Sequence, residues 1–337
     1  MRQWIIAEWF EPQTDPTVIA VGHTAKDFVP MDRILSSRLM LREARAAIAK
    51  VGVTFEPVER ISGRRRTIVV PLLLSPLRLH GVMLWSGWAD EPVPPRSPAG
   101  AWCFDMRSST NIRSDDMLTT MGIPRERWDT VRRNSVADVF GGPYIVNHQE
   151  LSTLLRRLVH AVHGTNTQTM WAAVHESTGR LRAQQHSCRQ LDEPDHEGRI
   201  RHLVRGISYD VGPAAEVPSA PPPTTFAHQV LEASASTGRY SAILHPRTLH
   251  LLQWQGASMP HIAWQAYNGQ PLPAIHPDDI APAQAMAASL DDGEATGVIR
   301  VRALDGTWSP VSVHAAPLRL DATAAAILVT VRFADTT

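Results

Sequence analysis

The hydrophobic and polar positions repeat one order of elements three times along the chain. In residues 1–92, two strand-like apolar stretches precede a segment with apolar side chains at helical spacing, and three more strands follow it. The turn signals SGR and SPL separate these last strands. The predicted elements are strands at 4–10 and 17–22, a helix at 31–52, and strands at 55–61, 66–74 and 79–88. This block therefore has the order β-β-α-β-β-β.

The second block, residues 98–212, has the same order with more helix in its middle. Its clearest feature is an amphipathic helix at 148–164, whose leucines and valines recur with a period of 3.6 and whose last residue, Gly164, suits a C-terminal cap. The other predicted elements are a strand at 101–106, a short helix at 125–133, and strands at 167–176, 180–191 and 199–211. The block again ends in three successive strands.

The third block, residues 226–337, carries the strongest local signals. Pro277 suits the first position of a helix, and Asp278 and Asp279 complement the positive end of its dipole. Asp305-Gly306 lies between two alternating segments and predicts a two-residue hairpin turn. The predicted elements are strands at 239–246 and 249–256, a broken helical region at 257–273, a helix at 276–290, and strands at 293–304, 307–320 and 324–333.

Two proline-rich segments divide the three blocks. Residues 90–98 read DEPVPPRSP, and residues 211–225 read VGPAAEVPSAPPPTT. Proline cannot continue a helix or a central strand, so such segments favour extended, semi-rigid linkers. The sequence therefore predicts three tandem domains at 1–92, 98–212 and 226–337.

Charge and cysteine content narrow the classes of function. The 337 residues contain 33 basic and 33 acidic side chains, and no block exceeds neutrality by more than two basic residues, so we expect no nucleic-acid partner. Only Cys103 and Cys188 are present, which favours a reducing, cytoplasmic setting. The longest apolar stretch, at 67–77, contains two prolines, and we expect no membrane insertion.

The third block resembles a PAS domain. The motifs that carry the resemblance are HPDD at 276–279, Gly293-Glu294, Arg300-Val301-Arg302 and DGTW at 305–308, in the order and spacing of that family. The resemblance implies an antiparallel five-stranded sheet that encloses a small cavity under short helices. A ligand of such a domain lies between the inner sheet face and the helical segment.

The whole chain is similar to a family of mycobacterial and related actinobacterial cytosolic proteins built from three sensor domains. The segments that carry this similarity are WIIAEWF at the start, VPMDRIL downstream and the meander LHGVMLWSGWADEPVPP. The resemblance implies an α+β fold of three tandem PAS-like or GAF-like domains, each an antiparallel sheet of about five strands with short helices on one face. The sequence does not separate PAS from GAF for the first two blocks.

The residues that could form a ligand site follow from the PAS resemblance. Aromatic rings with polar tips suit a small-molecule pocket, because they combine apolar area with hydrogen-bonding groups. The same rings can fill a core, and close packing is the default for protein interiors. The candidate ligand-binding residues are Trp254, His261, Trp264, Tyr267 and Trp308. His261 could also be compared with the helical axial histidine of haem-binding PAS domains, but we expect neither haem nor flavin, since neither cysteine matches a flavin-binding motif.

The sequence signals for a metal site or a catalytic site are weaker than those for a ligand pocket. His160 and His163 share a face of the amphipathic helix and could bind a transition metal with a third ligand, although imidazoles also suit the end of a helix. The chain carries no GxGxxG, Walker, GxSxG or HExxH motif and no kinase loops. We therefore expect no enzyme.

The sequence as a whole favours a non-catalytic cytosolic sensor. It would bind an unidentified small molecule or protein partner and would signal in trans, through its linkers or a homodimer interface, because no output motif is recognisable. A structural scaffold with filled cavities is the first alternative, and an unrecognised enzyme with polar groups converging in one cavity is the second.

Overall fold

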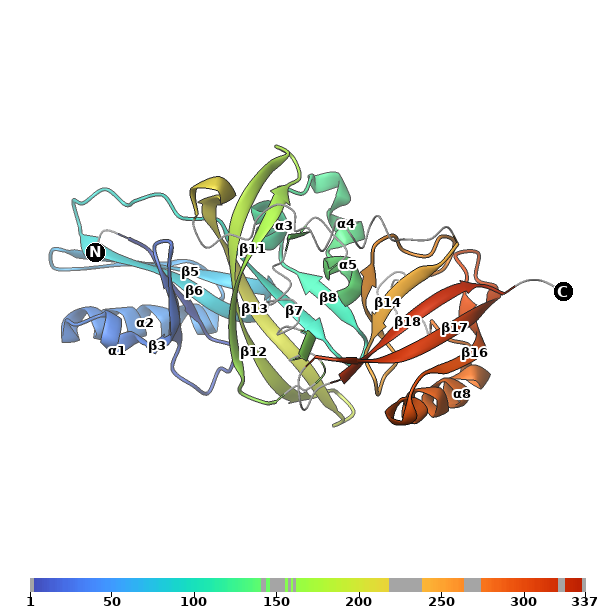
Figure 1. Ribbon diagram of the computed structural model, residues 1–337. Helices are drawn as coiled ribbons and strands as arrows, with labels where there is room; N and C mark the ends of the chain where they lie inside the picture. The colour runs from blue at the N-terminus through green and yellow to red at the C-terminus, as the bar shows by residue number, and fades with distance from the viewer. Residues whose placement is uncertain are drawn as a thin grey trace.

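A computed structural model of the chain describes residues 3–140, 144–145, 155–156, 159, 162–217, 238–263, 274–320 and 325–334. Three antiparallel sheets follow one another along the chain, from the blue N-terminal block to the red C-terminal block of Figure 1. In each sheet the first strand of the block lies between the second strand and the last strand. The described part of the chain is mostly strand with few helices, which confirms the predicted α+β class.

The first sheet has six strands in the order β3-β2-β1-β6-β5-β4. Its strands are β1 (Ile5–Glu8), β2 (Thr17–Val21), β3 (Thr24–Pro30), β4 (Val58–Ser62), β5 (Arg65–Ser75) and β6 (Arg78–Trp88). The pattern predicted five of these strands and missed β3, an edge strand that is mostly exposed and ends in proline. Edge strands with polar, exposed faces lack the alternation that identifies a half-buried strand.

The predicted helix at 31–52 is two helices, α1 (Met31–Ile34) and α2 (Arg38–Thr54). The break occurs because Ser37 is the N-cap of α2, and its hydroxyl accepts a hydrogen bond from the backbone N–H of Met40. The buried side chains of α2 recur every three or four residues and pack on one face of the first sheet. They include Ala44, Ala47, Ile48 and Val51.

The middle sheet has seven strands in the order β10-β11-β12-β13-β7-β8-β9. Its strands are β7 (Ala99–Asp105), β8 (Thr110–Arg113), β9 (Arg133–Ser135), β10 (Tyr144–Ile145), β11 (Asn166–His175), β12 (Arg180–Pro194) and β13 (Ile200–Pro213). The sequence predicted β7, β11, β12 and β13 but not the short strands β8, β9 and β10. The expectation of about five strands is therefore too low for the first two sheets.

Short helices cover one face of the middle sheet (Figure 1). They are α3 (Asp115–Thr120), η1 (Arg125–Arg127), α4 (Trp128–Val131) and α5 (Val136–Phe140). Most of the predicted helix at 148–164 lies outside the described residues. Residues 155–156 and 159 within it are helical, and Gly164 has a φ of +79°, as its predicted capping role requires.

The third sheet has five strands in the order β15-β14-β18-β17-β16, as predicted. Its elements are β14 (Tyr240–Leu244), β15 (Leu251–Gln255), α8 (Pro277–Ala288), η3 (Ser289–Asp292), β16 (Ala295–Arg302), β17 (Trp308–Arg319) and β18 (Ala325–Phe333). The hairpin at Asp305-Gly306 has a three-residue loop instead of two, since the N–H of Ala303 bonds the carbonyl of Thr307. Gly306 then adopts a φ of +87°.

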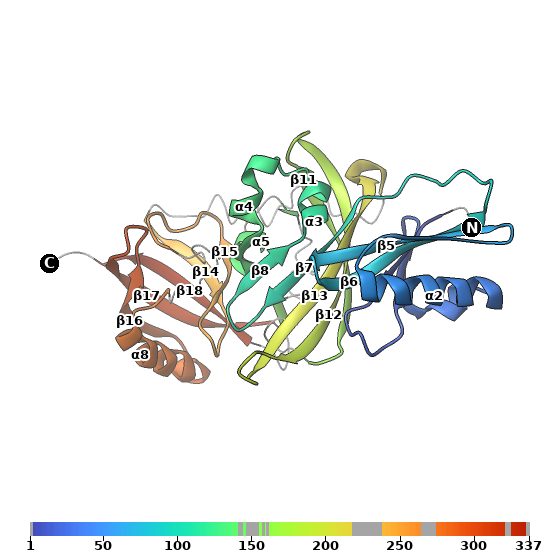
Figure 2. The ribbon, with the colours of Figure 1, turned by 180° about the vertical axis from the view of Figure 1, so that it is seen from behind.

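The first two blocks share a buried layer between their sheets. One face of the first sheet packs on α2, and the other packs on β12 and β13 of the middle sheet (Figure 2). The shared cluster contains Trp4, Ile6, Phe10, Ile19, Ala20, Phe28, Leu72, Met83 and Trp85 from the first block, and Ala99, Leu191, Ile207 and Tyr209 from the second. The blocks are therefore joined by a common core as well as by the chain.

The proline-rich segment after β6 is held against the first block. The indole N–H of Trp4 donates to the carbonyl of Pro94 over 2.8 Å, and Ser97 Oγ lies 2.9 Å from His23 Nε2. The third block is also packed on its neighbour, because Leu155 and Val159 cover the back of the third sheet at Ile243. We conclude that sheet packing, more than linker length, fixes the blocks in place.

Candidate functional site

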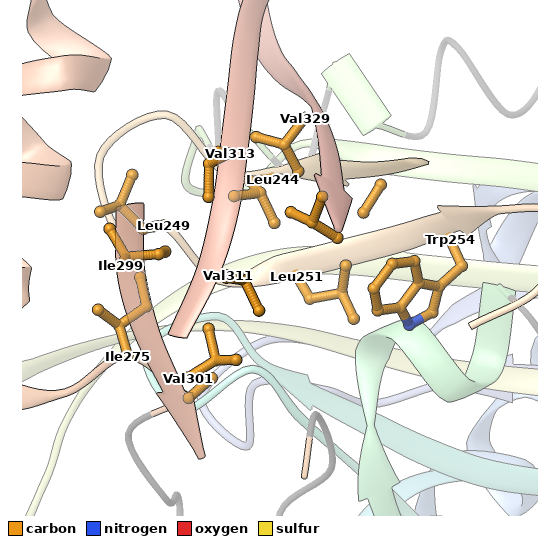
Figure 3. A pocket seen from close by; sticks show the side chains of 13 residues that line it. Leu244, Leu249, Leu251, Trp254, Ile275, Ile299, Val301, Val311, Val313 and Val329 are labelled. Carbon is orange, nitrogen blue, oxygen red and sulfur yellow. The ribbon is translucent and has the colours of Figure 1, made fainter. Parts of the chain in front are cut away.

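A small apolar cavity lies where the PAS resemblance places a ligand, under the inner face of the third sheet. Its volume is about 50 Å³. Figure 3 shows side chains from neighbouring strands facing this space, with Trp254 at its edge. The lining residues are Ala242, Leu244, Leu249, Leu251, Trp254, Ala274, Ile275, Ile299, Val301, Val311, Val313, Val329 and Val331.

The structure does not bring the five predicted ligand residues together. Trp254 lines the cavity, whereas Trp264 and Tyr267 lie outside the described residues. His261 is exposed in the left-handed region, with a φ of +62°, and its carbonyl accepts a hydrogen bond from the N–H of Leu304. The expectation that His261 faces the cavity is therefore corrected.

Trp308 also points away from the cavity. Side chains alternate along a strand, and Val311 and Val313 face the cavity, so Trp308 lies on the opposite face of β17. There its ring centroid lies 4.7 Å from that of His276 and 4.6 Å from the guanidinium carbon of Arg302. The aromatic residue of the DGTW motif thus packs at the start of α8, and the motif did not reveal this orientation.

The size of this cavity limits what it can bind. Small-molecule sites occupy about 300–1,000 Å³, and an engineered cavity of about 150 Å³ accepts benzene. A space of about 50 Å³ lined by aliphatic side chains is smaller than either. The geometry favours a nearly filled core over a metabolite pocket in this block.

We expect Val331→Ile to raise the free energy of unfolding by about 1 kcal/mol. The added methylene enters existing space, and burial of one methylene contributes about 0.8 kcal/mol. Val331 is buried and lines the cavity. Urea denaturation of the full chain measures the change. Val18→Ile, in the filled layer under α2, is the matched control and should be neutral or destabilising. Destabilisation of Val331→Ile by more than 1 kcal/mol would contradict an open cavity.

Among the described residues, the structure places no further metal ligand beside the candidate pair His160 and His163. His160 lies outside the described residues. Nδ1 of His163 accepts a hydrogen bond of 3.0 Å from the backbone N–H of Asp192, and its Nε2 lies 3.9 Å from Glu11. Across the described ranges no three His, Cys, Asp or Glu side chains gather as a metal site requires.

A second, larger hollow lies between the first two blocks, and we call it the inter-block cleft. Its volume is about 580 Å³, within the range of small-molecule sites. The first block contributes the loop after β1, the end of α2 and the turn between β5 and β6, and the middle block contributes His163, the end of β12 and Arg205 of β13. The lining residues are Trp9, Phe10, Glu11, Pro12, Gln13, Gly52, Phe55, Leu77, Arg78, Leu79, His163, Leu191, Asp192, Glu193, Pro194 and Arg205.

Two arginines share one carboxylate in the wall of the cleft. Arg78 Nη2 lies 2.9 Å from one oxygen of Glu193, and Arg205 Nη2 lies 2.6 Å from the other. Arg205 also donates to the carbonyl of Phe10. Its side chain is 10% exposed, whereas that of Arg78 is 33% exposed and reaches the open space.

A second charged group lies next to the cleft and reaches it through Glu11. Arg189 of β12 donates to Glu8 over 2.8 Å and to Glu11 over 3.3 Å, so it ties the middle block to the first. Glu8 is 2% exposed; its burial raises the pKa of the carboxyl, while the charge of Arg189 opposes the rise. His80 lies beside this group, fully buried, with its ring 5.6 Å from that of Phe10.

Sequence reasoning missed the inter-block cleft because no local pattern marks it. Its walls come from six separated segments, between residue 9 and residue 205. The aromatic and charged side chains in each segment look like ordinary loop or strand-end residues. The one local signal is the run LDEP at 191–194, in which two acidic residues precede a proline, and such a run is also typical of an ordinary turn.

Comparisons with known proteins identify the two ends of the chain. Residues 3–95 match the family model described as Rv3651-like, N-terminal, and residues 224–337 match Rv3651-like, C-terminal domain. The two matches together span more than half of the chain. A search of curated proteins finds no match.

One solved structure has the same fold over nearly the whole chain. A crystal structure of an uncharacterized protein from Mycobacterium tuberculosis has a TM-score of 0.81 at 23% identity, covering 99% of this chain and 97% of that one. An RNA-binding light-oxygen-voltage receptor has a TM-score of 0.24 at 10% identity, covering 70% of this chain and 95% of its own, and carries no argument. The first likeness establishes that the three-sheet arrangement exists in a mycobacterial protein.

Proposed function

We propose that this chain, which belongs to the Rv3651-like family, is a non-catalytic sensor that binds a small molecule in the inter-block cleft. The observation that carries the proposal is a cleft of about 580 Å³ with walls from two blocks. Ligand sites occur preferentially at such boundaries, because a guest there contacts both partners at once. The small cavity of the third block supports a structural role for that block.

The proposed signal is a change in how the first two sheets pack. A guest that contacts both Leu77 of the first block and Pro194 of the second stabilises one arrangement of the blocks over others. The change passes through the shared core and the charged group at Arg189, which join the same two blocks. A separate protein partner would recognise the altered surface.

The PAS resemblance supports a sensor-type fold for the third block, while the proposed guest binds in the inter-block cleft. Its five-stranded antiparallel sheet and the small cavity under its inner face are the features that the resemblance implied. In all three sheets the first strand of the block lies between the second strand and the last strand. This shared strand order supports a common origin as sensor-type domains. Whether the first two blocks are PAS-like or GAF-like does not alter the proposal, because the cleft depends on their mutual packing.

Leu77→Asp is expected to reduce retention of a co-purified guest at least tenfold. Leu77 lines the cleft yet is 78% exposed, so the change alters the wall without disturbing the core. Native mass spectrometry of the full chain, purified from an actinobacterial host, measures the occupancy. Leu304→Asp, at a site 70% exposed in the third block, is the matched control and should keep the guest.

Two results would count against the sensor proposal. Wild-type protein that carries no guest and forms stable oligomers would favour the scaffold alternative. Equal retention of a guest by wild type and Leu77→Asp would place the binding site elsewhere.

A further inference from the structure

We infer that the inter-block cleft selects molecules with one acidic head and an apolar body, an inference that rests on the proposed function. The first step is the distribution of charge on its walls. Glu11 shares the guanidinium of Arg189 with Glu8, and Asp192 lies 2.7 Å from His202 Nδ1. Glu193 is the remaining acid, and it serves two guanidinium groups.

The excess of positive charge is therefore local to Glu193, where two guanidinium groups face one carboxylate, and Arg78 is the more exposed of the two. Arg205 bonds Glu193 at 2.6 Å and is fixed by the Phe10 carbonyl, so it is the better partner of that carboxylate. Arg78 uses only Nη2 on Glu193, and its Nη1 and Nε make no hydrogen bond to any described part of the chain. Guanidinium donors in this fork arrangement match the oxygens of a carboxylate or phosphate.

The apolar body of the ligand has its own wall. Leu77 and Leu79 flank Arg78 in the sequence, and Trp9 and Phe55 also line the cleft, with the ring of Trp9 against Gly52 of α2. Leu77 is 78% exposed, so its side chain is accessible to a guest in the cleft. An acid head at Arg78 would bring an attached apolar group directly onto these side chains.

A pair of fluorescent probes separates the head from the body. Anilinonaphthalene sulfonate carries an anionic group, and phenylnaphthylamine has nearly the same aromatic body without a charge. We expect the sulfonate to bind the wild-type full chain at one saturable site, at least tenfold more tightly than the neutral probe. Decanoate or decyl phosphate should displace it, and decanol should not.

Variants then assign the effect to the proposed residues. Arg78→Met should weaken sulfonate binding at least tenfold and leave the neutral probe within twofold, whereas Arg78→Lys should recover part of the loss. Leu77→Asp should weaken both probes. Arg332→Met, an exposed arginine of the third block, is the matched control and should change neither.

The outcomes separate this inference from the proposed function. Equal binding of the two probes, failure of both decyl acids to displace the sulfonate, or an unchanged sulfonate affinity in Arg78→Met would overturn the acidic-head inference. The proposed function would survive such a result if Leu77→Asp still released the co-purified guest. If neither probe binds and Leu77→Asp retains that guest, both the inference and the proposed function fail.

Discussion

Acidification from pH 7 to pH 5 is expected to lower the free energy of unfolding by about 4 kcal/mol, because two imidazoles are buried uncharged. His80 is completely buried between the first two sheets, and His186 is buried in the middle block. Burial lowers the pKa of His186 to about 3. Burial, and then the charge of Arg205, lower the pKa of His80 well below its ordinary 6.5.

The direction of the effect follows from where the protons bind. Below pH 6.5 the unfolded chain binds a proton at each histidine, while the folded chain does not, so stability is complete above that pH and falls as acid is added. Between neutral pH and pH 5, each buried histidine lowers the free energy of unfolding by about 2 kcal/mol. His250, whose pKa burial also lowers, adds to the loss, while Glu8 offsets part of it, since burial raises its pKa.

Urea denaturation at pH 7, 6 and 5 measures the loss. His80→Leu should reduce the pH dependence by about half, because the buried imidazole is gone and its Nε2 had no partner in the described chain. His196→Gln, at a side chain 84% exposed, is the matched control and should keep the full dependence. A stability that stays flat between pH 7 and pH 5 would contradict buried neutral imidazoles.

The sequence predicted the elements wherever one short stretch of chain carries its own signal. The third block shows this best, because Pro277, the acidic first turn of α8 and the glycine of the hairpin each act within a few residues. The three long strands of the middle block also followed from their apolar content. Strands β3 and β9 did not, since they are short or exposed and their pairing supplies the order that their sequences lack.

The candidate site was less predictable, because contacts between distant residues create it. The PAS resemblance predicted a cavity in the third block with Trp254 as one candidate residue, but it gave no volume. The side to which Trp308 points depends on the register of β16 with β17. The inter-block cleft exists only because two sheets pack face to face. No spacing within the sequence encodes the meeting of Arg78 with Glu193.

Replacement of Arg189 by methionine is expected to destabilise the protein by about 3–5 kcal/mol, the usual result of leaving a buried charge without its partner. The partner is Glu8, which is 2% exposed and would keep only the hydroxyl of Thr17 and the N–H of Phe10. The same guanidinium donates to Asn166 over 2.8 Å. The loss should appear in urea denaturation as a lower midpoint of the full chain.

A double-mutant cycle assigns the loss to the buried pair. The double variant Glu8→Gln with Arg189→Met removes the charge together with its partner, so it should be at least 2 kcal/mol more stable than Arg189→Met alone. Arg180→Met, on the same strand but exposed, is the matched control and should stay within about 0.5 kcal/mol of wild type. If Arg189→Met costs less than about 1 kcal/mol, or the double variant gains nothing, then Arg189 does not stabilise Glu8, and the charged group cannot couple the two blocks as proposed.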